Sequence, residues 1–241
     1  MPEEFALLTA SFGATSAKTI GPREFFCAQA GGRELVFVCS RIGKVAAAST
    51  ATTLIQSFGV DALLMTGVAG GVNAKVKVGD VVVADALVQH DIDLKGVLGC
   101  RRFDIPLLNC SFLAADPHLS QVANDAARAA VRDPRYVSAV SGLGLSAAEA
   151  HSGVVASGDQ FIDSGHERGE LERLIPGLLA VEMEGAAVAQ VCAEHGVPFA
   201  VSRVISDSAD RHAPVDFVSF IQRAAAVGSE RLVCEFVSRL P

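Results

Sequence analysis

The stretch VEMEGAAVAQVCAEHGVPFAVSRVISDSAD, residues 181–210, decides the fold class of this chain. A helix is expected over Glu184–His195, because Gly196 and Pro198 then stop it, and the apolar run 198–205 has the length of a buried strand. Polar side chains flank these elements: Glu182, Glu184, Arg203, Ser206, Asp207 and Asp210. Such residues can converge at the carboxyl edge of an open sheet, where these folds bind ligands. The alternative is a helix with negative charge near its N-terminus, beside a capped turn.

On both sides of this stretch, apolar runs alternate with segments of helical period, which is typical of an α/β sheet. The sequence predicts further strands over Glu34–Cys39, Asp61–Thr66, Asp80–Leu87, Gly153–Ala156 and Leu178–Val181. It predicts helices over Lys44–Phe58 and Pro117–Val131, and a C-terminal helix with Phe217, Phe220, Ile221, Ala224, Ala225 and Val227 on its apolar face. Ser138–Ser152 is expected to be a loop. We therefore expect one domain over residues 1–241, a three-layer α/β/α fold with a mostly parallel mixed central sheet.

Composition limits the class of protein. The chain has 241 residues, 50% of them hydrophobic and 20% charged, enough for a sizeable core. A net charge of −7 disfavours a nucleic-acid-binding surface. No apolar stretch approaches the ~20 residues of a membrane span, and no signal peptide is recognisable. The six cysteines are scattered, which favours reduced thiols, so we expect a cytoplasmic protein without a membrane partner.

Several other kinds of site find little support. The segment Gly67-Val-Ala-Gly-Gly71 is neither a dinucleotide fingerprint nor a P-loop, and we expect a tight turn whose backbone can approach a ligand. A G-x-S-x-G nucleophile elbow is missing. The six histidines lack metal-ligand spacing, and His90–Asp93 alone is a weak metal candidate. We therefore expect no metal and no redox cofactor.

Taken together, Val181–Ala187 and Arg203–Asp210 resemble the signature of the methylthioadenosine/S-adenosylhomocysteine nucleosidases, members of the nucleoside phosphorylase superfamily. Further segments resemble that family in the same order: Met1–Leu8, Ile42–Ala48, Thr66–Gly71 with Val78–Val83, and Ser157–Ile162. The similarity covers nearly the whole chain and weakens between about Gly96 and Val154. It implies a purine nucleosidase that hydrolyses the N-glycosidic bond of 5′-methylthioadenosine, and of S-adenosylhomocysteine, to release adenine.

The resemblance also implies roles for individual residues. Asp207 would protonate the leaving purine, and Glu4 would activate the water molecule. Glu184, with Glu182 beside it, would bind the ribose hydroxyls, while Arg203 would position Glu184 or the water. The remaining site residues would contact the sugar, the base or the 5′ group. Met183 and Ile42 would contact the sugar, Phe161 and Ile162 the adenine, Ser206, Ala69 and Gly70 the walls of the site, and Phe217 the 5′ side.

Two alternatives stay open. A phosphorylase of the same superfamily would use phosphate instead of water, and such enzymes carry an arginine before the Gly-rich segment, where this chain has Leu64-Met-Thr-Gly-Val68. The loop Ser40–Lys44 nevertheless holds two basic residues. The other alternative is a non-catalytic nucleoside-binding protein, because fold does not fix function.

Two features depart from the family pattern. The family begins with an apolar strand before its acidic segment, whereas Met1 here almost adjoins Glu4, so either the start lies upstream or the sheet lacks a strand. The family's usual aromatic residue of the dimer loop is Val97 here. The resemblance implies a homodimer, and the apolar loop residues Val97, Phe103, Ile105 and Leu107 are consistent with an interface.

Overall fold

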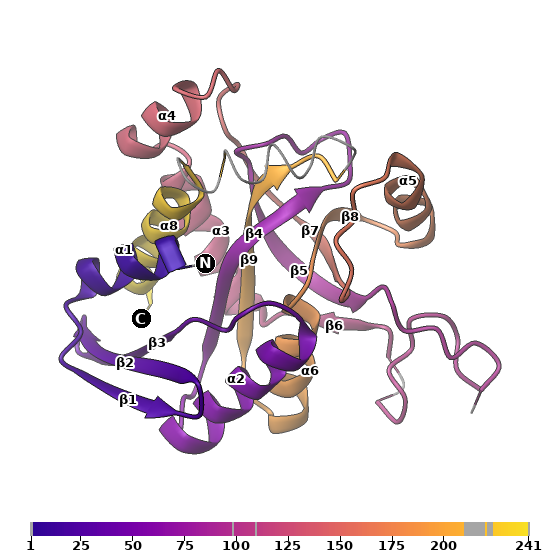
Figure 1. Ribbon diagram of the computed structural model, residues 1–241, viewed down its shortest axis with the longest axis horizontal. Coiled ribbons are helices and arrows are strands. Elements are labelled where there is room, and N and C mark those ends of the chain that lie inside the picture. The colour runs from indigo at the N-terminus through magenta and orange to yellow at the C-terminus, as the bar shows by residue number, and fades with distance from the viewer. Residues whose placement is uncertain (1, 98, 109, 210–219, 221–223, 241) are drawn as a thin grey trace.

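The computed structural model describes residues 2–97, 99–108, 110–209, 220 and 224–240 (Figure 1). Nine strands and seven named helices are defined within those ranges. The first half of the chain forms α1 (Pro2–Phe12), β1 (Ser16–Ile20), β2 (Arg23–Ala30), β3 (Arg33–Val38), α2 (Lys44–Phe58), β4 (Leu63–Gly71), β5 (Val81–Gln89) and β6 (Phe112–Ala114). The second half forms α3 (Pro117–Ala130), α4 (Pro134–Ser141), β7 (Ala150–Ser157), α5 (Gly165–Leu174), β8 (Leu178–Glu182), α6 (Gly185–His195), β9 (Phe199–Asp207) and α8 (Ala226–Arg239).

The main sheet has the strand order β6-β5-β7-β8-β4-β9, and β5 also pairs with β9, so that the sheet curls back on itself. Pairing is parallel between β4 and β9, β5 and β7, and β7 and β8. It is antiparallel between β5 and β6, β5 and β9, and at the end of β4 against β8. The predicted mixed sheet is therefore confirmed. The strands β1, β2 and β3 form a separate antiparallel sheet.

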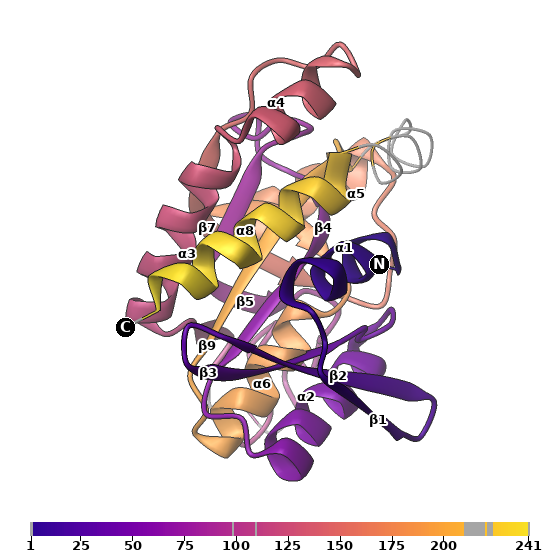
Figure 2. The ribbon, with the colours of Figure 1, turned by 90° about the vertical axis from the view of Figure 1, so that its left-hand side faces the viewer.

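Helices cover both faces of the main sheet, as Figures 1 and 2 show. The helices α2 and α6 pack into one apolar core, whereas α1, α3, α4 and α8 contribute to the other. Strand β9 supplies both cores: Val201 and Ile205 belong to the first, and Ala200 and Val204 to the second. Because both faces of β9 are covered, its sequence is a continuous apolar run instead of an alternating one. The three-layer α/β/α prediction is thus confirmed.

Register brings three strand ends together. Gly70 of β4 lies beside Asp207 of the parallel strand β9. On its other side, Gly70 pairs with Val181, one residue before the end of β8. The polar residues that follow or end these strands therefore lie at one edge of the sheet, as the sequence predicts.

Most predicted elements lie within a few residues of their observed bounds, but two predictions were wrong. The Gly-rich segment is not a turn after the strand, because β4 continues through Gly71 with β9 as its partner. The expected loop Ser138–Ser152 is shorter, because α4 extends to Ser141 and β7 begins at Ala150. The prediction did not include α1, β1, β2, β6, α4 or α5. Of the predicted C-terminal helical face, Phe217 and Ile221 lie outside the described residues.

Two further expectations concern the environment of the chain. No helix of the described residues is long and apolar enough to span a bilayer. All six cysteines are free thiols. The cytoplasmic location stays a prediction.

Candidate active site

A cavity of about 580 Å³ lies at the edge where β4, β8 and β9 end. Every predicted site residue that the structure describes lines it: Glu4, Ile42, Ala69, Gly70, Phe161, Ile162, Glu182, Met183, Glu184, Arg203, Ser206 and Asp207. The remaining predicted residue, Phe217, lies outside the described part of the chain, as does Asp210. The fold thus brings together residues that are up to about 200 positions apart in the sequence. Several loops and strand ends each contribute residues to the site.

An ion-paired cluster forms one wall of the cavity. The guanidinium of Arg203 is buried against the carboxylate of Glu182, and its Nη2 lies 3.5 Å from Oε2 of Glu184. Glu182 also accepts hydrogen bonds from the hydroxyl of Ser157 and from the backbone N–H of Gly185, the latter at 2.8 Å. Buried charges are tolerated when they are paired and hydrogen-bonded. Glu182 therefore binds mainly the protein itself and holds Arg203 in place.

Glu184 connects this cluster to helix α2. Its Oε1 accepts a hydrogen bond of 2.9 Å from the backbone N–H of Gly43, which immediately precedes α2. Burial raises the pKa of the Glu184 carboxyl; Arg203 opposes that shift, and the nearby charge of Glu182 adds to it. Glu184 thus lies where ribose hydroxyls could meet a carboxylate with a fixed orientation.

Asp207 is 2% exposed and ends β9. Its Oδ2 accepts a hydrogen bond from the hydroxyl of Ser206, and its Oδ1 accepts one from the backbone N–H of Ala209, both at 2.9 Å. The next carbonyl, of Ser208, accepts a 2.9 Å hydrogen bond from Nη1 of Arg168 on α5. The Asp207 carboxylate therefore stabilises the turn that follows β9, as expected for a capped turn. It also faces the cavity.

Two glycines of β4 leave the room that these side chains need. A Cβ atom on Gly67 would lie 2.1 Å from Nη1 of Arg203, and one on Gly70 would lie 2.8 Å from Oδ1 of Asp207. Both distances are too short for any real contact. The Gly-rich segment thus contributes to the site through the absence of side chains, which is one common use of glycine in a strand.

The loop that carries Phe161 and Ile162 is fixed by polar contacts at its start. Oδ1 of Asp159 accepts a 2.8 Å hydrogen bond from the backbone N–H of Lys44, and Oδ2 of Asp91 accepts one of 3.0 Å from the backbone N–H of Asp159. Lys44 Nζ lies 2.5 Å from Oδ1 of Asp91. Ile162 is buried, whereas Phe161 is 46% exposed at the cavity. Asp91 thus has a lysine partner, and the described residues contain no group of three His, Cys, Asp or Glu that could hold a metal ion.

Glu4 reaches the cavity from α1. It is 4% exposed, and its Oε1 accepts a 2.6 Å hydrogen bond from the hydroxyl of Ser229 on α8. The acidic segment at the N-terminus is therefore helical, and its carboxylate is held by the other end of the chain.

Sequence reasoning missed several residues that support this site. Ser157 and Gly43 lie within segments that resemble the family. Their contacts with Glu182 and Glu184 nevertheless could not be predicted from the sequence. Arg168 and Ser229 lie on helices without any motif, and no local pattern could have identified them. Their partners are 40 and 225 residues away in the sequence.

The geometry agrees with comparisons to known proteins. Residues 1–238 match the family described as the phosphorylase superfamily. The 5′-methylthioadenosine/S-adenosylhomocysteine nucleosidase of Shewanella oneidensis is 36% identical over 225 residues, which are 93% of this chain and 88% of that protein. The crystal structure of the corresponding Neisseria meningitidis enzyme with methylthio-immucillin-A has a TM-score of 0.86 and 32% identity, covering 100% of this chain and 96% of that one.

A futalosine hydrolase structure from Helicobacter pylori is nearly as similar, with a TM-score of 0.84 and 32% identity over 100% of this chain and 95% of that one. Family membership rests on the match along the whole chain, which includes every segment that forms the cavity. The chain belongs to the phosphorylase superfamily and, within it, to the 5′-methylthioadenosine/S-adenosylhomocysteine nucleosidases.

Proposed function

We propose that this protein hydrolyses the N-glycosidic bond of 5′-methylthioadenosine and S-adenosylhomocysteine and releases adenine. The observation that carries the proposal is the convergence of two buried carboxylates, Asp207 and Glu4, with the Arg203 cluster on one cavity. Cleavage of such a bond passes through an oxocarbenium-like sugar. It needs an acid for the purine, a base for water and groups that hold the ribose.

Each requirement has a candidate residue. Asp207 donates a proton to N7 of adenine as the bond between C1′ and N9 breaks. Glu4 accepts a proton from water, whose oxygen forms the new bond to C1′. Glu184 accepts hydrogen bonds from ribose hydroxyls, and such contacts strengthen in the transition state. Met183 and Ile42 line the sugar side of the cavity, and Phe161 lies at its exposed mouth, where it can stack on adenine.

The charges at the cavity favour water over phosphate as the nucleophile. A phosphate dianion needs a cation that is not already neutralised. Among the described lining residues the arginines are Arg41 and Arg203, and Arg203 pairs with two carboxylates. Nη2 of the exposed Arg41 donates to the carbonyl of Pro22, and Lys44 pairs with Asp91. Of the two basic residues that kept a phosphorylase possible, Lys44 is thus neutralised by a carboxylate, whereas Arg41 keeps its charge and one of its N–H groups is bonded to a carbonyl.

Adenine release from 5′-methylthioadenosine, measured with and without phosphate, tests this function. We expect equal rates in both buffers and free methylthioribose as the second product. A requirement for phosphate with formation of a ribose 1-phosphate would favour the phosphorylase. No adenine under either condition would favour a non-catalytic nucleoside-binding protein.

The preference for a 5′ substituent is a separate question. Phe217, the residue predicted at the 5′ side, lies outside the described part of the chain. Since a protein of nearly equal structural similarity is a futalosine hydrolase, futalosine belongs in the substrate panel beside 5′-methylthioadenosine and S-adenosylhomocysteine. The ratios of kcat/KM define the preference.

We also propose that two copies of the chain form a homodimer. Apolar side chains are exposed at the start of α2 and on the loop before β6: Ile42, Val45, Val97 and Leu107 are 67%, 81%, 52% and 91% exposed. The loop prediction was wrong for Phe103 and Ile105, which are buried within this chain.

Exposed apolar side chains favour a protein interface. Leu107→Glu should place a charge in the proposed dimer interface. The mass measured by light scattering should then shift towards that of the monomer. Val137→Glu, at a half-exposed position on α4, is the control and should leave the mass unchanged. A monomeric and fully active wild-type chain would contradict the dimer.

A further inference from the structure

Two of the described hydrogen bonds attach helix α1, which carries Glu4, to the C-terminal helix α8. Ser229 of α8 donates to Oε1 of Glu4 at 2.6 Å, and Ser11 donates to Oε1 of Glu230 at 2.7 Å. Glu4 and Ser11 lie about two helical turns apart, so both point from the same face of α1. Their partners are consecutive residues of α8. The two contacts together therefore fix both the position and the rotation of α1.

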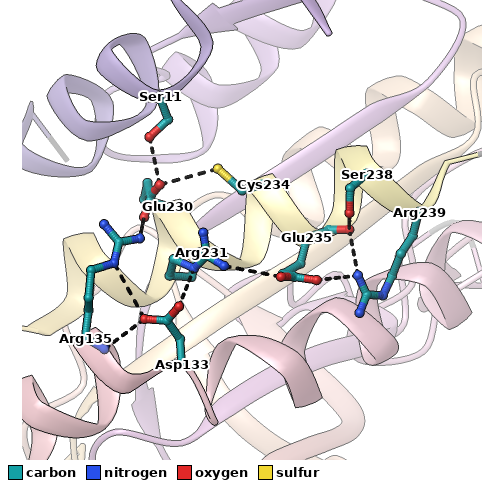
Figure 3. Close-up of polar contacts among 9 residues, drawn as sticks. All are labelled: Ser11, Asp133, Arg135, Glu230, Arg231, Cys234, Glu235, Ser238 and Arg239. Atoms are coloured by element: carbon teal, nitrogen blue, oxygen red, sulfur yellow. Dashed lines mark hydrogen bonds and ion pairs between the residues drawn. The ribbon is translucent and has the colours of Figure 1, made fainter. Parts of the chain in front are cut away.

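The α8 side of this attachment is itself held firmly. Oε2 of the buried Glu230 accepts a 2.7 Å hydrogen bond from Nη2 of Arg135, and Cys234 also points to Glu230 (Figure 3). Arg231, the next residue of α8, has its Nε 2.8 Å from Oδ2 of Asp133. Arg135 and Asp133 lie in and just before α4, so ion pairs join α8 to a third helix. α1 thus packs against a braced surface and not against a single mobile helix.

The burial of the Glu4 contact determines what the contact can do. Ser229 is 0% exposed and Glu4 is 4% exposed, so water competes little for this hydrogen bond. A hydroxyl that donates to a carboxylate oxygen restricts the rotation of the carboxylate. The orientation of the other carboxylate oxygen towards the cavity is thereby restricted as well. General base catalysis requires the acceptor to lie within hydrogen-bond reach of the water that it deprotonates.

We infer that Ser229 is a positioning residue for the water-activating base, and that α8 is the frame which sets Glu4 in the cavity. The inference rests on the proposed role of Glu4. It assigns a part in the reaction to the C-terminal helix, which does not line the cavity with any described residue. Among the described residues, the Ser229 hydroxyl bonds to Glu4 and does not line the cavity, so Ser229 acts through Glu4.

A double-mutant cycle tests this inference. Ser229→Ala should lower kcat for adenine release about tenfold, a fraction of the roughly 10²–10⁴-fold that a general base supplies. The Kd for adenine should stay unchanged. In a Glu4→Gln background, Ser229→Ala should cost almost nothing more, because residues that act as one unit are non-additive. Ser229→Thr keeps a hydroxyl and should recover most of the lost kcat.

Ser238→Ala is the matched control, because Ser238 lies exposed on the same helix and bonds only to the carbonyl of Glu235 among the described contacts. It should leave kcat unchanged. Equal losses from Ser229→Ala in the wild-type and Glu4→Gln backgrounds would overturn the positioning role and leave the proposed function intact. No adenine release by the wild-type chain would instead refute the proposed function itself.

Discussion

Replacement of Asp207 by asparagine separates catalysis from stability more sharply than any other change at this site. Among the described contacts, the carboxylate accepts from the Ser206 hydroxyl at Oδ2 and from the Ala209 N–H at Oδ1. An asparagine can keep its oxygen towards Ala209, which leaves its NH₂ group towards Ser206. The Ser206 hydroxyl can then accept from that NH₂ and donate to the carbonyl of Ala69, which lies 3.3 Å away. The substitution can therefore keep a hydrogen bond at both of these described positions.

The two expected magnitudes follow from this geometry. Because the hydrogen bonds can rearrange, the free energy of unfolding should fall by no more than about 1 kcal/mol. For a chain of this size that corresponds to a loss of about 2–4 °C in Tm. The amide cannot deliver a proton to the purine, so kcat should fall by roughly 10²–10⁴-fold. Adenine should still bind.

The assay measures adenine release and the melting curve on the same sample. Asp116→Asn is the matched control, because Oδ1 of Asp116 accepts a backbone hydrogen bond at the start of α3, away from the cavity. It should change Tm by a similar amount and leave kcat unaltered. A variant at position 207 with lower Tm and near-normal kcat would refute the assignment of Asp207 as the acid and leave it the role of a turn residue.

Three further predictions concern the Arg203 wall. Gly67→Ala should lower kcat at least tenfold, because its Cβ would displace the guanidinium; measured beside Gly169→Ala, which has open space around it, normal kcat for both would contradict the packing argument. Glu182→Gln should lower the free energy of unfolding by about 3 kcal/mol in urea titrations, because it breaks a buried ion pair, and a loss below ~1 kcal/mol would mean that Glu184 alone satisfies Arg203. Burial raises the pKa of Glu184, so ionisation of this group opposes folding, and stability is lost as pH rises through the raised pKa. The Tm of Glu184→Gln minus that of the wild type should therefore increase as pH rises from about 4 to 7. A difference that stays constant over this range would contradict the raised pKa of Glu184.

The elements that could be predicted are those whose burial is visible as an apolar run or a helical period within a short segment of sequence. Strand β9 is apolar on both faces and α2 has helical period, so both lie close to their predicted bounds. The hairpin β1–β2 was missed because β1 is largely exposed and carries almost no apolar alternation. Helix α5 is charged over most of its length and buries only Leu171 among its described residues, so its periodicity is weak. Such elements form through tertiary contacts, which a single sequence does not display.

The candidate site was predictable to the extent that its residues fall in compact segments. Glu184, Arg203 and Asp207 were all identified from residues 181–210. That they share one cavity was predicted because the carboxyl ends of neighbouring strands meet at one edge of the sheet. The roles of these residues stay predictions. The contact between Glu4 and Ser229 spans 225 residues, and no spacing rule connects the two ends of a chain.

The pairing of β4 with β9 links the fold to the chemistry. In the observed register Gly67 lies beside Arg203 and Gly70 beside Asp207, so each functional side chain has a neighbour without a Cβ. The register shifts between Ala69 and Gly70, which advances β9 by one extra residue, Ser206. Bulges of this kind re-aim side chains next to functional sites. A slip by one residue would set Val68 against one of these groups and reverse the faces of the strand. The same glycines therefore enforce the register and create the space for Arg203 and Asp207, so that in β4 strand pairing and the geometry of the site cannot be varied independently.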